Sequence, residues 1–379
     1  MTRRGYAGTM GFPPLVEPVA ALSDAERART ARHAALVGFG ELAQRRLAAA
    51  RIAIVGAGGL GSPAVLALAA AGAGELVVID DDTVELSNLH RQVMHRVRDV
   101  GAAKVDSAAR VAADLAPETI VRTVRERITA QNAATILAGV DVVIDGTDTF
   151  ESRSAVAAAC ELSGTPLVWG TVQEFNAQVT VFWSAPPAGS PVVLADLYPP
   201  ESVGELPTCA EVGVLGALCI QVGGILAIEA IKLVTGIGEP LLGRVLLIDA
   251  LGARMREVPL RTATATAPAP PAEEVVLVQP GDLAEHRAAG ACVLDVREPH
   301  ETAAGTIDGA ILIPLGTLLE NPDAAGRGPF VVVCQAGARA RRAAAALRAA
   351  GATASVLDGG MNAYTRTGMK TEMSTGERP

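Results

Sequence analysis

One cysteine, Cys334, is placed where its thiol can act as a nucleophile. It follows the apolar run Val331–Val333 and precedes an Ala- and Arg-rich segment, with Gly337 inside the intervening loop. A loop that ends a strand and opens a helix can aim backbone N–H groups and the helix dipole at a sulfur atom, which favours the thiolate. Arg339 and the two arginines after it add positive charge. The pattern therefore favours a thiol that carries a persulfide over a merely buried cysteine.

A second candidate site is a glycine-rich turn earlier in the chain. Gly56, Gly58 and Gly59 belong to the sequence Gly-Ala-Gly-Gly-Leu-Gly, which follows an apolar strand and opens a helix. Backbone N–H groups at such a turn bind phosphate. Asp80 ends the next predicted strand, where a carboxylate can hydrogen-bond a ribose hydroxyl. Taken alone, this fingerprint favours a nicotinamide or flavin dehydrogenase, and it identifies a nucleotide rather than a reaction.

Polar residues downstream of Asp80 shift the balance towards ATP. They are Ser87, Asn88, Leu89, His90, Arg91 and Gln92 in one run, then Lys104, and Asp148 after an apolar strand. Two cations and an amide exceed what a diphosphate needs, whereas attack on an α-phosphorus requires charge neutralised along a triphosphate. The carboxylates of Asp80, Asp82 and Asp148 can serve ribose and Mg²⁺. The sequence contains no Gly-x-x-x-x-Gly-Lys-Ser/Thr loop, so a P-loop ATPase is not the alternative.

The elements that must position these residues are predicted from hydrophobic periodicity. Strand, glycine turn, helix and strand succeed one another over residues 52–79, which forms a βαβ unit and predicts a Rossmann-like, mostly parallel α/β sheet. Ser23 is predicted to cap a polar helix that runs towards Ala50 with a break near Gly38–Gly40. Further strands are expected at Val140–Ile144, Leu167–Val168, Gln178–Phe182 and Arg244–Ile248, and helices at Lys104–Leu115 and Ser152–Leu162.

A Pro-, Ala- and Thr-rich stretch, residues 263–274, predicts a semi-rigid linker between two domains. Beyond it, short strands alternate with helices, and the strands are expected at Val275–Val278, Cys292–Val296, Ile311–Pro314, Phe330–Cys334 and Ser355–Leu357. We therefore predict an N-terminal arm (1–27), an ATP-binding α/β domain (28–262), the linker, a small α/β domain (275–370) and a tail (371–379).

The first domain resembles the ThiF/MoeB family, the bacterial relatives of ubiquitin-activating enzymes. The resemblance rests on the glycine turn, Asp80-x-Asp82, Ser-Asn-Leu-His-Arg-Gln, Lys104 and Thr147-Asp148. It implies a homodimer that binds ATP with Mg²⁺ and adenylates the C-terminal Gly-Gly carboxylate of a ubiquitin-like sulfur-carrier protein. By the same resemblance, Gly59 and Asp80 hold adenosine and ribose, Asn88, Arg91 and Lys104 hold the phosphates, Asp148 holds the metal, and Arg32 reaches the triphosphate bound by the other protomer.

The small domain resembles rhodanese. It carries Leu-Asp-Val-Arg-Glu at 294–298, Gly-Thr-Ile-Asp-Gly-Ala at 305–310, and a six-residue Cys-x-x-Gly-x-Arg loop, which suits sulfur transfer better than the longer loop of related phosphatases. The resemblance implies persulfide sulfur on Cys334, loaded from thiosulfate or from a cysteine desulfurase. Ala340 stands where serine is usual, and we expect this to tune the rate without inactivating the loop. The whole fusion is similar to adenylyltransferase-sulfurtransferases of the MoeZ type.

Two further positions bear on the mechanism. Thr208-Cys209 matches a Thr-Cys element of the family, whose cysteine is implicated in acyl-persulfide or thioester intermediates in some relatives. A functional and a structural role for Cys209 are equally supported. Thr149 stands where the family usually has Asn, close to the expected nucleotide path, and so bears on substrate preference.

Composition bounds the partners and the compartment. The net charge is -9, without clustered basic residues, which argues against nucleic acid as the main partner. The five cysteines are widely spaced and include no Cys-x-x-Cys pair, so neither a disulfide framework nor structural zinc is expected, and the cytoplasm is the default. The uncharged segment Val212–Ile228 is nearly long enough to span a membrane, but Glu229 and Lys232 favour a buried core or dimer-interface helix.

The predicted reaction has two stages. The carrier carboxylate attacks the ATP α-phosphorus to give an acyl-adenylate, and a Cys334 persulfide then attacks the acyl carbon. A second thiol, for which Cys209 is a candidate, releases the thiocarboxylate. Two rivals stay open at this point: an NAD-dependent oxidoreductase with an appended rhodanese fold, and a non-catalytic carrier-binding scaffold.

Overall fold

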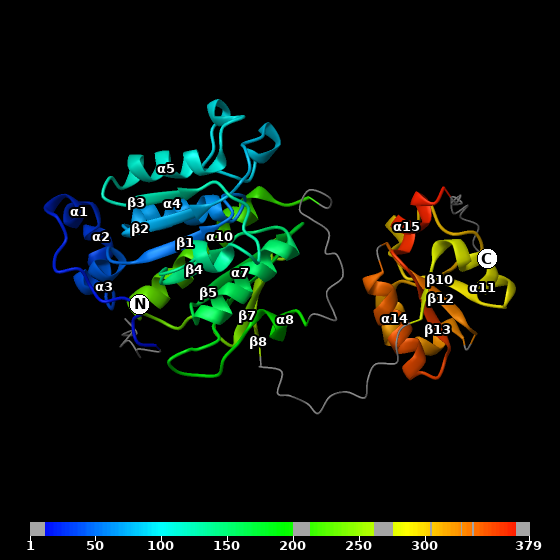
Figure 1. The fold of residues 1–379 in the computed structure, drawn as a ribbon. Coiled ribbons are helices and arrows are strands. Elements are labelled where there is room, and N and C mark those ends of the chain that lie inside the picture. Colours follow the sequence, from blue (N-terminus) through cyan, green and yellow to red (C-terminus); the bar gives the residue numbers. More distant parts are fainter. Residues whose placement is uncertain are drawn as a thin grey trace. The chain divides into compact units, whose positions relative to one another are not determined.

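The chain forms two compact units, which are described separately (Figure 1). The computed structural model describes residues 12–199, 213–260 and 276–368, apart from residues 304, 327 and 336. The predicted linker, the predicted tail and Cys209 lie outside the described residues.

An eight-stranded sheet organises the first unit, in the order β3-β2-β1-β4-β5-β6-β7-β8. In this order, the first five strands, from β3 across the sheet to β5, pair in parallel. The remaining pairs, from β5 to β8, are antiparallel. The strands are β1 (Arg51–Val55), β2 (Glu75–Ile79), β3 (Ile120–Val124), β4 (Val142–Asp145), β5 (Leu167–Gln173), β6 (Asn176–Phe182), β7 (Arg244–Asp249) and β8 (Arg254–Pro259). The predicted mostly parallel α/β fold is confirmed.

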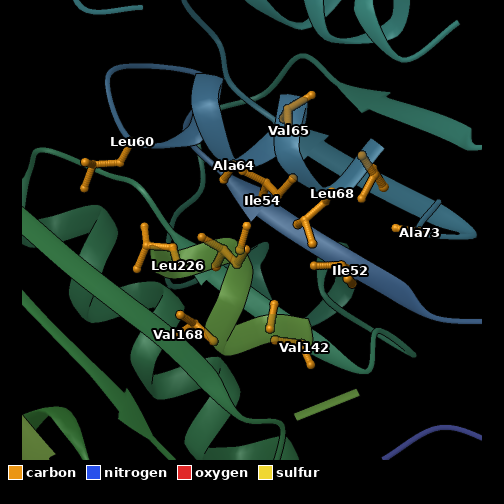
Figure 2. Close-up of a cluster of buried hydrophobic side chains, with 14 of the residues drawn as sticks. Ile52, Ile54, Leu60, Ala64, Val65, Leu68, Ala73, Val142, Val168 and Leu226 are labelled. Atoms are coloured by element: carbon orange, nitrogen blue, oxygen red, sulfur yellow. The ribbon is translucent and has the colours of Figure 1, made fainter. Parts of the chain in front are cut away.

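Helices cover both faces of this sheet, because successive strand residues point to opposite sides. Ile52 and Ile54 of β1 pack against α4 and α10, as Figure 2 shows, whereas Ala53 and Val55 pack against α6 and α7. The helices and single 3-10 turns of these layers are α4 (Gly61–Ala71), η1 (Leu86–Asn88), η2 (Val97–Asp99), α5 (Lys104–Leu115), α6 (Ala133–Ile136), α7 (Phe150–Ser163), α8 (Leu194–Leu197) and α10 (Gly216–Thr235).

Helix α10 accounts for the long apolar segment of the sequence. Within the described residues it is the one helix long and apolar enough to cross a membrane, and 56% of its most apolar window is buried inside the unit. Leu218, Val222 and Leu226 belong to the main core, and the buried Glu229 pairs with Lys232 at 2.5 Å. These contacts are those of a core helix.

The N-terminal region is divided more often than the helix with one break that we predicted. It forms three short helices, α1 (Asp24–Arg29), α2 (Ala31–Ala34) and α3 (Gly40–Leu47). Ser23 caps α1 as predicted, since its hydroxyl accepts a 3.0 Å hydrogen bond from the Glu26 N–H. Gly38 and Gly40 have φ values of 89° and 68°, which a continuous helix cannot contain. The prediction of a break there is confirmed, and the helix before it is shorter than expected.

The second unit is a five-stranded parallel sheet in the order β11-β10-β12-β13-β9. All five predicted strands are present: β9 (Leu277–Val278), β10 (Cys292–Asp295), β11 (Ile311–Leu312), β12 (Phe330–Val333) and β13 (Ala354–Leu357). Its helices and 3-10 turns are η4 (Pro280–Asp282), α11 (Leu283–Ala288), α12 (Pro299–Thr302), α13 (Leu315–Glu320), η5 (Pro322–Ala325), α14 (Ala338–Ala349) and α15 (Gly360–Arg366). Strand β12 is central, so the loop after it sits where neighbouring loops can brace it.

Candidate functional site

The turn between β1 and α4 lies at the carboxyl edge of the first sheet. Gly56 has a φ of 90°, and a Cβ on it would lie 2.9 Å from the carbonyl oxygen of Gly146. Asp80 fixes the turn, because its Oδ2 accepts a 2.7 Å hydrogen bond from the Ala57 N–H. Burial raises the pKa of the Asp80 carboxyl, and the charge of Lys104 opposes that rise. The predicted glycines and Asp80 are therefore brought together.

A pair of glycines tests how tightly this turn is packed. A Cβ on Gly61 would overlap the carbonyl oxygen of Gly56, whereas a Cβ on Gly224 of α10 would meet open space. We expect Gly61→Ala to destabilise the first unit by about 1–3 kcal/mol through overpacking, and to weaken nucleotide binding. Gly224→Ala should be neutral, or stabilise by up to about 1 kcal/mol through helix propensity.

Urea unfolding followed by tryptophan fluorescence checks this expectation. Both tryptophans, Trp169 and Trp183, lie in the first unit, so the signal reports on that unit within the full chain. Equal unfolding midpoints for the two variants would show that the turn tolerates a side chain.

Arg91 and Gln92 lie over the same turn. A Cβ on Gly59 would be 3.8 Å from Arg91 Cδ, and one on Gly58 would be 3.6 Å from Gln92 Nε2. Gln92 is 4% exposed, and its Oε1 has no hydrogen-bond partner among the described residues. A buried amide oxygen without a partner is costly, so it is a ready acceptor for a hydroxyl of a bound nucleotide.

The rest of the Ser87–Gln92 run supports these two side chains. Asn88 is buried, and its Oδ1 accepts a 3.2 Å hydrogen bond from the Glu85 N–H, which closes η1. Ser87 Oγ donates to Glu85 Oε2 at 3.1 Å. Leu89 is half-buried and His90 is exposed. Ser87 and Asn88 thus have a structural task in addition to any contact with a phosphate.

Lys104 begins α5 and is 6% exposed, with its Nζ 2.7 Å from Asp82 Oδ2. Side-chain oxygens of Asp80, Asp81 and Asp82 lie within 4.8 Å of one another. Each is engaged, since Asp80 accepts backbone N–H groups and Asp81 pairs with Arg127 at 3.2 Å. The lysine and the three aspartates form one cluster of charged side chains beside the glycine turn.

Asp148 and Thr149 join β4 to α7. Asp148 is exposed and makes no ion pair with another described residue, so its carboxylate is available to a cation. Thr149 caps α7, because its hydroxyl accepts a 3.3 Å hydrogen bond from the Ser152 N–H. Thr and Asn both serve as helix N-caps, so the departure at Thr149 keeps this local structure.

Two buried charged residues beside this motif were not among the predicted site residues. Asp145 is fully buried and Arg153 is 5% exposed, with Arg153 Nε 3.9 Å from Asp145 Oδ2. Arg153 also donates to the Thr147 carbonyl at 3.1 Å and lies over the Trp169 ring. In the sequence, Arg153 could have been noticed as the one arginine of the Ala-rich helix that follows Asp148.

His95 is a third missed residue. It is 6% exposed, and its Nε2 lies 3.1 Å from the Ala57 carbonyl oxygen of the glycine turn. Burial lowers the pKa of its imidazole, so the ring is neutral near pH 7 and donates one N–H to that carbonyl. Ala57 is therefore held at its N–H by Asp80 and at its carbonyl by His95.

The predicted Arg32 is not brought to this group of residues. It is exposed on α2 and forms no hydrogen bond or ion pair with another described residue. An arginine that acts on the nucleotide bound by another protomer would be exposed and unpaired in its own protomer, as Arg32 is among the described residues. The assignment of Arg32 to that role stays a prediction.

Cys334 lies directly after β12 and is 1% exposed. The Gly337 N–H donates to its Sγ at 3.1 Å, as the predicted loop geometry requires. Helix α15 braces the loop from the other side, since the N–H groups of Met361 and Asn362 donate to the carbonyls of Cys334 and Gln335 at 2.9 and 3.0 Å. The sulfur thus accepts one backbone hydrogen bond, in a loop whose carbonyl groups are held by α15.

The Leu-Asp-Val-Arg-Glu motif also braces this loop. Buried Arg297 pairs with Asp295 at 2.7 Å and donates to Gln335 Oε1 at 3.2 Å. Gln335 Nε2 in turn donates to Asn362 Oδ1 at 2.7 Å. Arg339, which was predicted to support the thiol, pairs with Glu301. Residues distant in sequence thus fix both ends of the cysteine loop.

Comparison with known proteins places both sites in families. Residues 30–269 match the ThiF family, and residues 279–367 match the Rhodanese-like domain. A probable adenylyltransferase/sulfurtransferase MoeZ of Mycobacterium tuberculosis is 40% identical over 383 residues, covering 94% of this chain and 97% of the relative. A sulfur carrier protein adenylyltransferase of Thermus thermophilus is 41% identical over 232 residues, covering 61% of this chain and 86% of the relative.

Solved structures agree on the fold of the first unit. The crystal structure of E. coli MccB with AMPCPP and MccA superposes with a TM-score of 0.55 at 20% identity, and covers 65% of this chain and 74% of that one. At this identity the likeness concerns the fold alone.

Proposed function

Because the chain belongs to the ThiF family and also carries a rhodanese-like domain, we propose that it adenylates the C-terminal Gly-Gly carboxylate of a ubiquitin-like sulfur carrier and then transfers sulfur to it. One observation carries the proposal: a single chain holds a glycine turn overlaid by Arg91 and Gln92, and a loop that cradles the Cys334 thiol. The Thermus thermophilus relative is named for action on a sulfur carrier, which supports this substrate class. An NAD-dependent oxidoreductase is set aside in favour of this family chemistry.

In the first stage, a carboxylate oxygen of the carrier attacks the α-phosphorus of ATP. The bond to the β-phosphate breaks, pyrophosphate leaves, and an acyl-adenylate remains. We assign the neutralisation of charge on the phosphates to Arg91 and Lys104. We assign contacts with the nucleoside to Gln92 and to the carboxylates that include Asp80. The exposed oxygen ligands of Asp148 suit Mg²⁺, which would supply further neutralisation of the triphosphate.

In the second stage, the outer sulfur of a Cys334 persulfide attacks the acyl carbon and AMP leaves. The product is an acyl disulfide between the carrier and Cys334. A second thiolate attacks Cys334 Sγ, so that the thiocarboxylate leaves and a new disulfide forms, which an external dithiol reduces. Cys209 is our candidate for the second thiol, and it lies outside the described residues.

We further propose a homodimer in which Arg32 serves the site of the other protomer. Ile220 and Ile228 of α10 are 45% and 53% exposed, and Leu42 of α3 is 48% exposed. Arg46 Nη1 donates to the Thr235 carbonyl at 3.2 Å and so ties α3 to α10. Exposed apolar side chains on neighbouring helices favour a protein interface.

The cytoplasm and the lack of structural zinc stay predictions. The described cysteines, Cys160, Cys219, Cys292 and Cys334, form no disulfide with one another. Burial raises the pKa of Cys160 to about 12, so this residue is an inert core thiol rather than a metal ligand.

The test uses the full chain and a recombinant ubiquitin-fold sulfur carrier that ends in Gly-Gly. Exchange of labelled pyrophosphate into ATP should depend on the carrier and vanish with a carrier that lacks its last glycine. With a sulfur donor and a dithiol added, intact mass should show one carrier oxygen replaced by sulfur. No exchange and no thiocarboxylate would leave the scaffold alternative standing, whereas exchange that does not depend on the carrier would contradict a sulfur carrier as the substrate.

A further inference from the structure

The guanidinium group that closes the cysteine loop is already engaged. Arg339 Nη1 donates to Glu301 Oε2 and Nη2 donates to Glu301 Oε1, both at 2.6 Å. The two planar groups thus meet as a bidentate pair, the strongest form of a charge-assisted contact. The side chains are 32% and 20% exposed, so the pair sits partly out of solvent. The cation nearest the end of the loop therefore has its opposite charge within the protein.

Glu301 is held ready for this contact by its own helix. Its Oε2 also accepts a 2.9 Å hydrogen bond from the Glu298 N–H, as part of the capping box of α12. The bonds from Arg339 hold the pKa of the Glu301 carboxyl below its usual value, so the group is ionised near pH 7. The carboxylate is thus a fixed part of the loop's surroundings and does not depend on a ligand for its position.

The other side chains of the loop offer a bound anion little. Gln335, Ala336 and Ala338 carry no charge. Arg297 is 4% exposed and pairs with the fully buried Asp295. The contact to Cys334 Sγ comes from the backbone N–H of Gly337. Arg341 and Arg342 are exposed further along α14, so an anion bound in the loop meets a backbone N–H group but no unpaired side-chain cation of the loop.

We propose that Glu301 sets the specificity for the sulfur donor. By neutralising Arg339 it disfavours thiosulfate, a dianion, and favours a persulfide carried by a thiol, which bears at most one charge on the sulfur to be transferred. The inference rests on the proposed function, since it requires that Cys334 accepts sulfur.

The favoured step is balanced without an added oxidant. The Cys334 thiolate attacks the outer sulfur of R–S–SH, the donor S–S bond breaks, and R–S⁻ leaves. The product is Cys334–S–SH, with the proton still on the transferred sulfur. Thiosulfate would transfer a sulfur atom at the same level with sulfite as the leaving group, so the two donors differ in the charge next to the transferred sulfur and not in the redox state of that sulfur.

The experiment compares two donors on the full chain, glutathione persulfide and thiosulfate, by following sulfur gain on Cys334 through intact mass against time. We expect Glu301→Gln, which frees the Arg339 guanidinium, to raise the second-order rate with thiosulfate roughly tenfold or more, the size of one charge-assisted hydrogen bond. The rate with glutathione persulfide should change much less. Retained loading from the persulfide also shows that the variant loop is folded.

Two further variants separate this effect from general electrostatics. Glu285→Gln removes an exposed carboxylate of α11 in the same unit, and should change neither rate more than about twofold. Adding Arg339→Gln to Glu301→Gln removes the freed cation, so the gain with thiosulfate should disappear. An unchanged donor preference in Glu301→Gln, or a gain that survives in the double variant, overturns the proposal.

A measurement on the unaltered chain covers the case in which the variants do not fold. If Arg339 is neutralised, the unaltered chain should load from glutathione persulfide faster than from thiosulfate at every salt concentration; faster loading from thiosulfate would contradict the proposal. If neither donor loads Cys334, the proposed function fails. If both load equally and Glu301→Gln alters neither rate, only the assignment of Glu301 fails.

Discussion

Cys334→Ser should abolish thiocarboxylate formation while leaving carrier-dependent exchange of pyrophosphate into ATP within about twofold of its original rate. A serine oxygen cannot hold the sulfane sulfur that the second stage passes on, so the product should fall to background. The fold should survive, because serine occupies similar volume and the backbone bonds from α15 to the loop do not involve the side chain.

Cys292→Ser is the matched control for this result. Cys292 is an exposed free thiol at the start of β10, in the same unit as Cys334. Its replacement should leave sulfur loading and thiocarboxylate formation unchanged. Persistent thiocarboxylate in Cys334→Ser, with donor and carrier as before, would mean that the carrier receives its sulfur elsewhere.

Buried apolar runs made most of the fold predictable. The inner strands of both sheets, among them β10, β12 and β13 of the second unit, are short hydrophobic stretches that only a sheet interior accommodates. The two missed strands, β3 and β8, lie at the sheet edges. Most residues of β3 and all residues of β8 are exposed, so neither presents the hydrophobic run by which a strand is recognised.

The candidate sites were predictable where the chemistry lies in one continuous run. The glycine turn, the run ending in Arg91 and Gln92, and the cysteine loop each combine an element boundary with reactive groups. His95, Arg153 and Glu301 were missed because each acts on a residue that the fold, and not the local sequence, brings near. Glu301 is the clearest case, since its partner Arg339 is 38 positions away.

Lys104→Met should lower carrier-dependent exchange of pyrophosphate into ATP by roughly 10²–10³-fold, the usual cost of removing one preorganised electrostatic group from a transition state. The position of Lys104 is fixed twice, by a 3.0 Å bond from its N–H to the Asp82 carbonyl and by the ion pair of its Nζ with the Asp82 carboxylate. Burial raises the pKa of Asp80, and the charge of Lys104 is the strongest influence that opposes this rise. The pKa of Asp80 should therefore rise further when Lys104 is replaced by Met. We expect most of the loss in kcat, with a smaller rise in the KM for ATP.

Arg122→Gln controls for charge alone. It removes an exposed cation of β3 whose ion pair with Glu75 spans 3.8 Å, and it should leave the exchange rate within about twofold. Sulfur loading on Cys334 should be normal in Lys104→Met, because that thiol belongs to the other unit. The two site variants therefore predict opposite losses: one keeps adenylation without sulfur transfer, and the other keeps sulfur loading without adenylation. A Lys104→Met enzyme that still exchanges pyrophosphate at the original rate would remove this lysine from the first stage and leave Arg91 as its proposed cation.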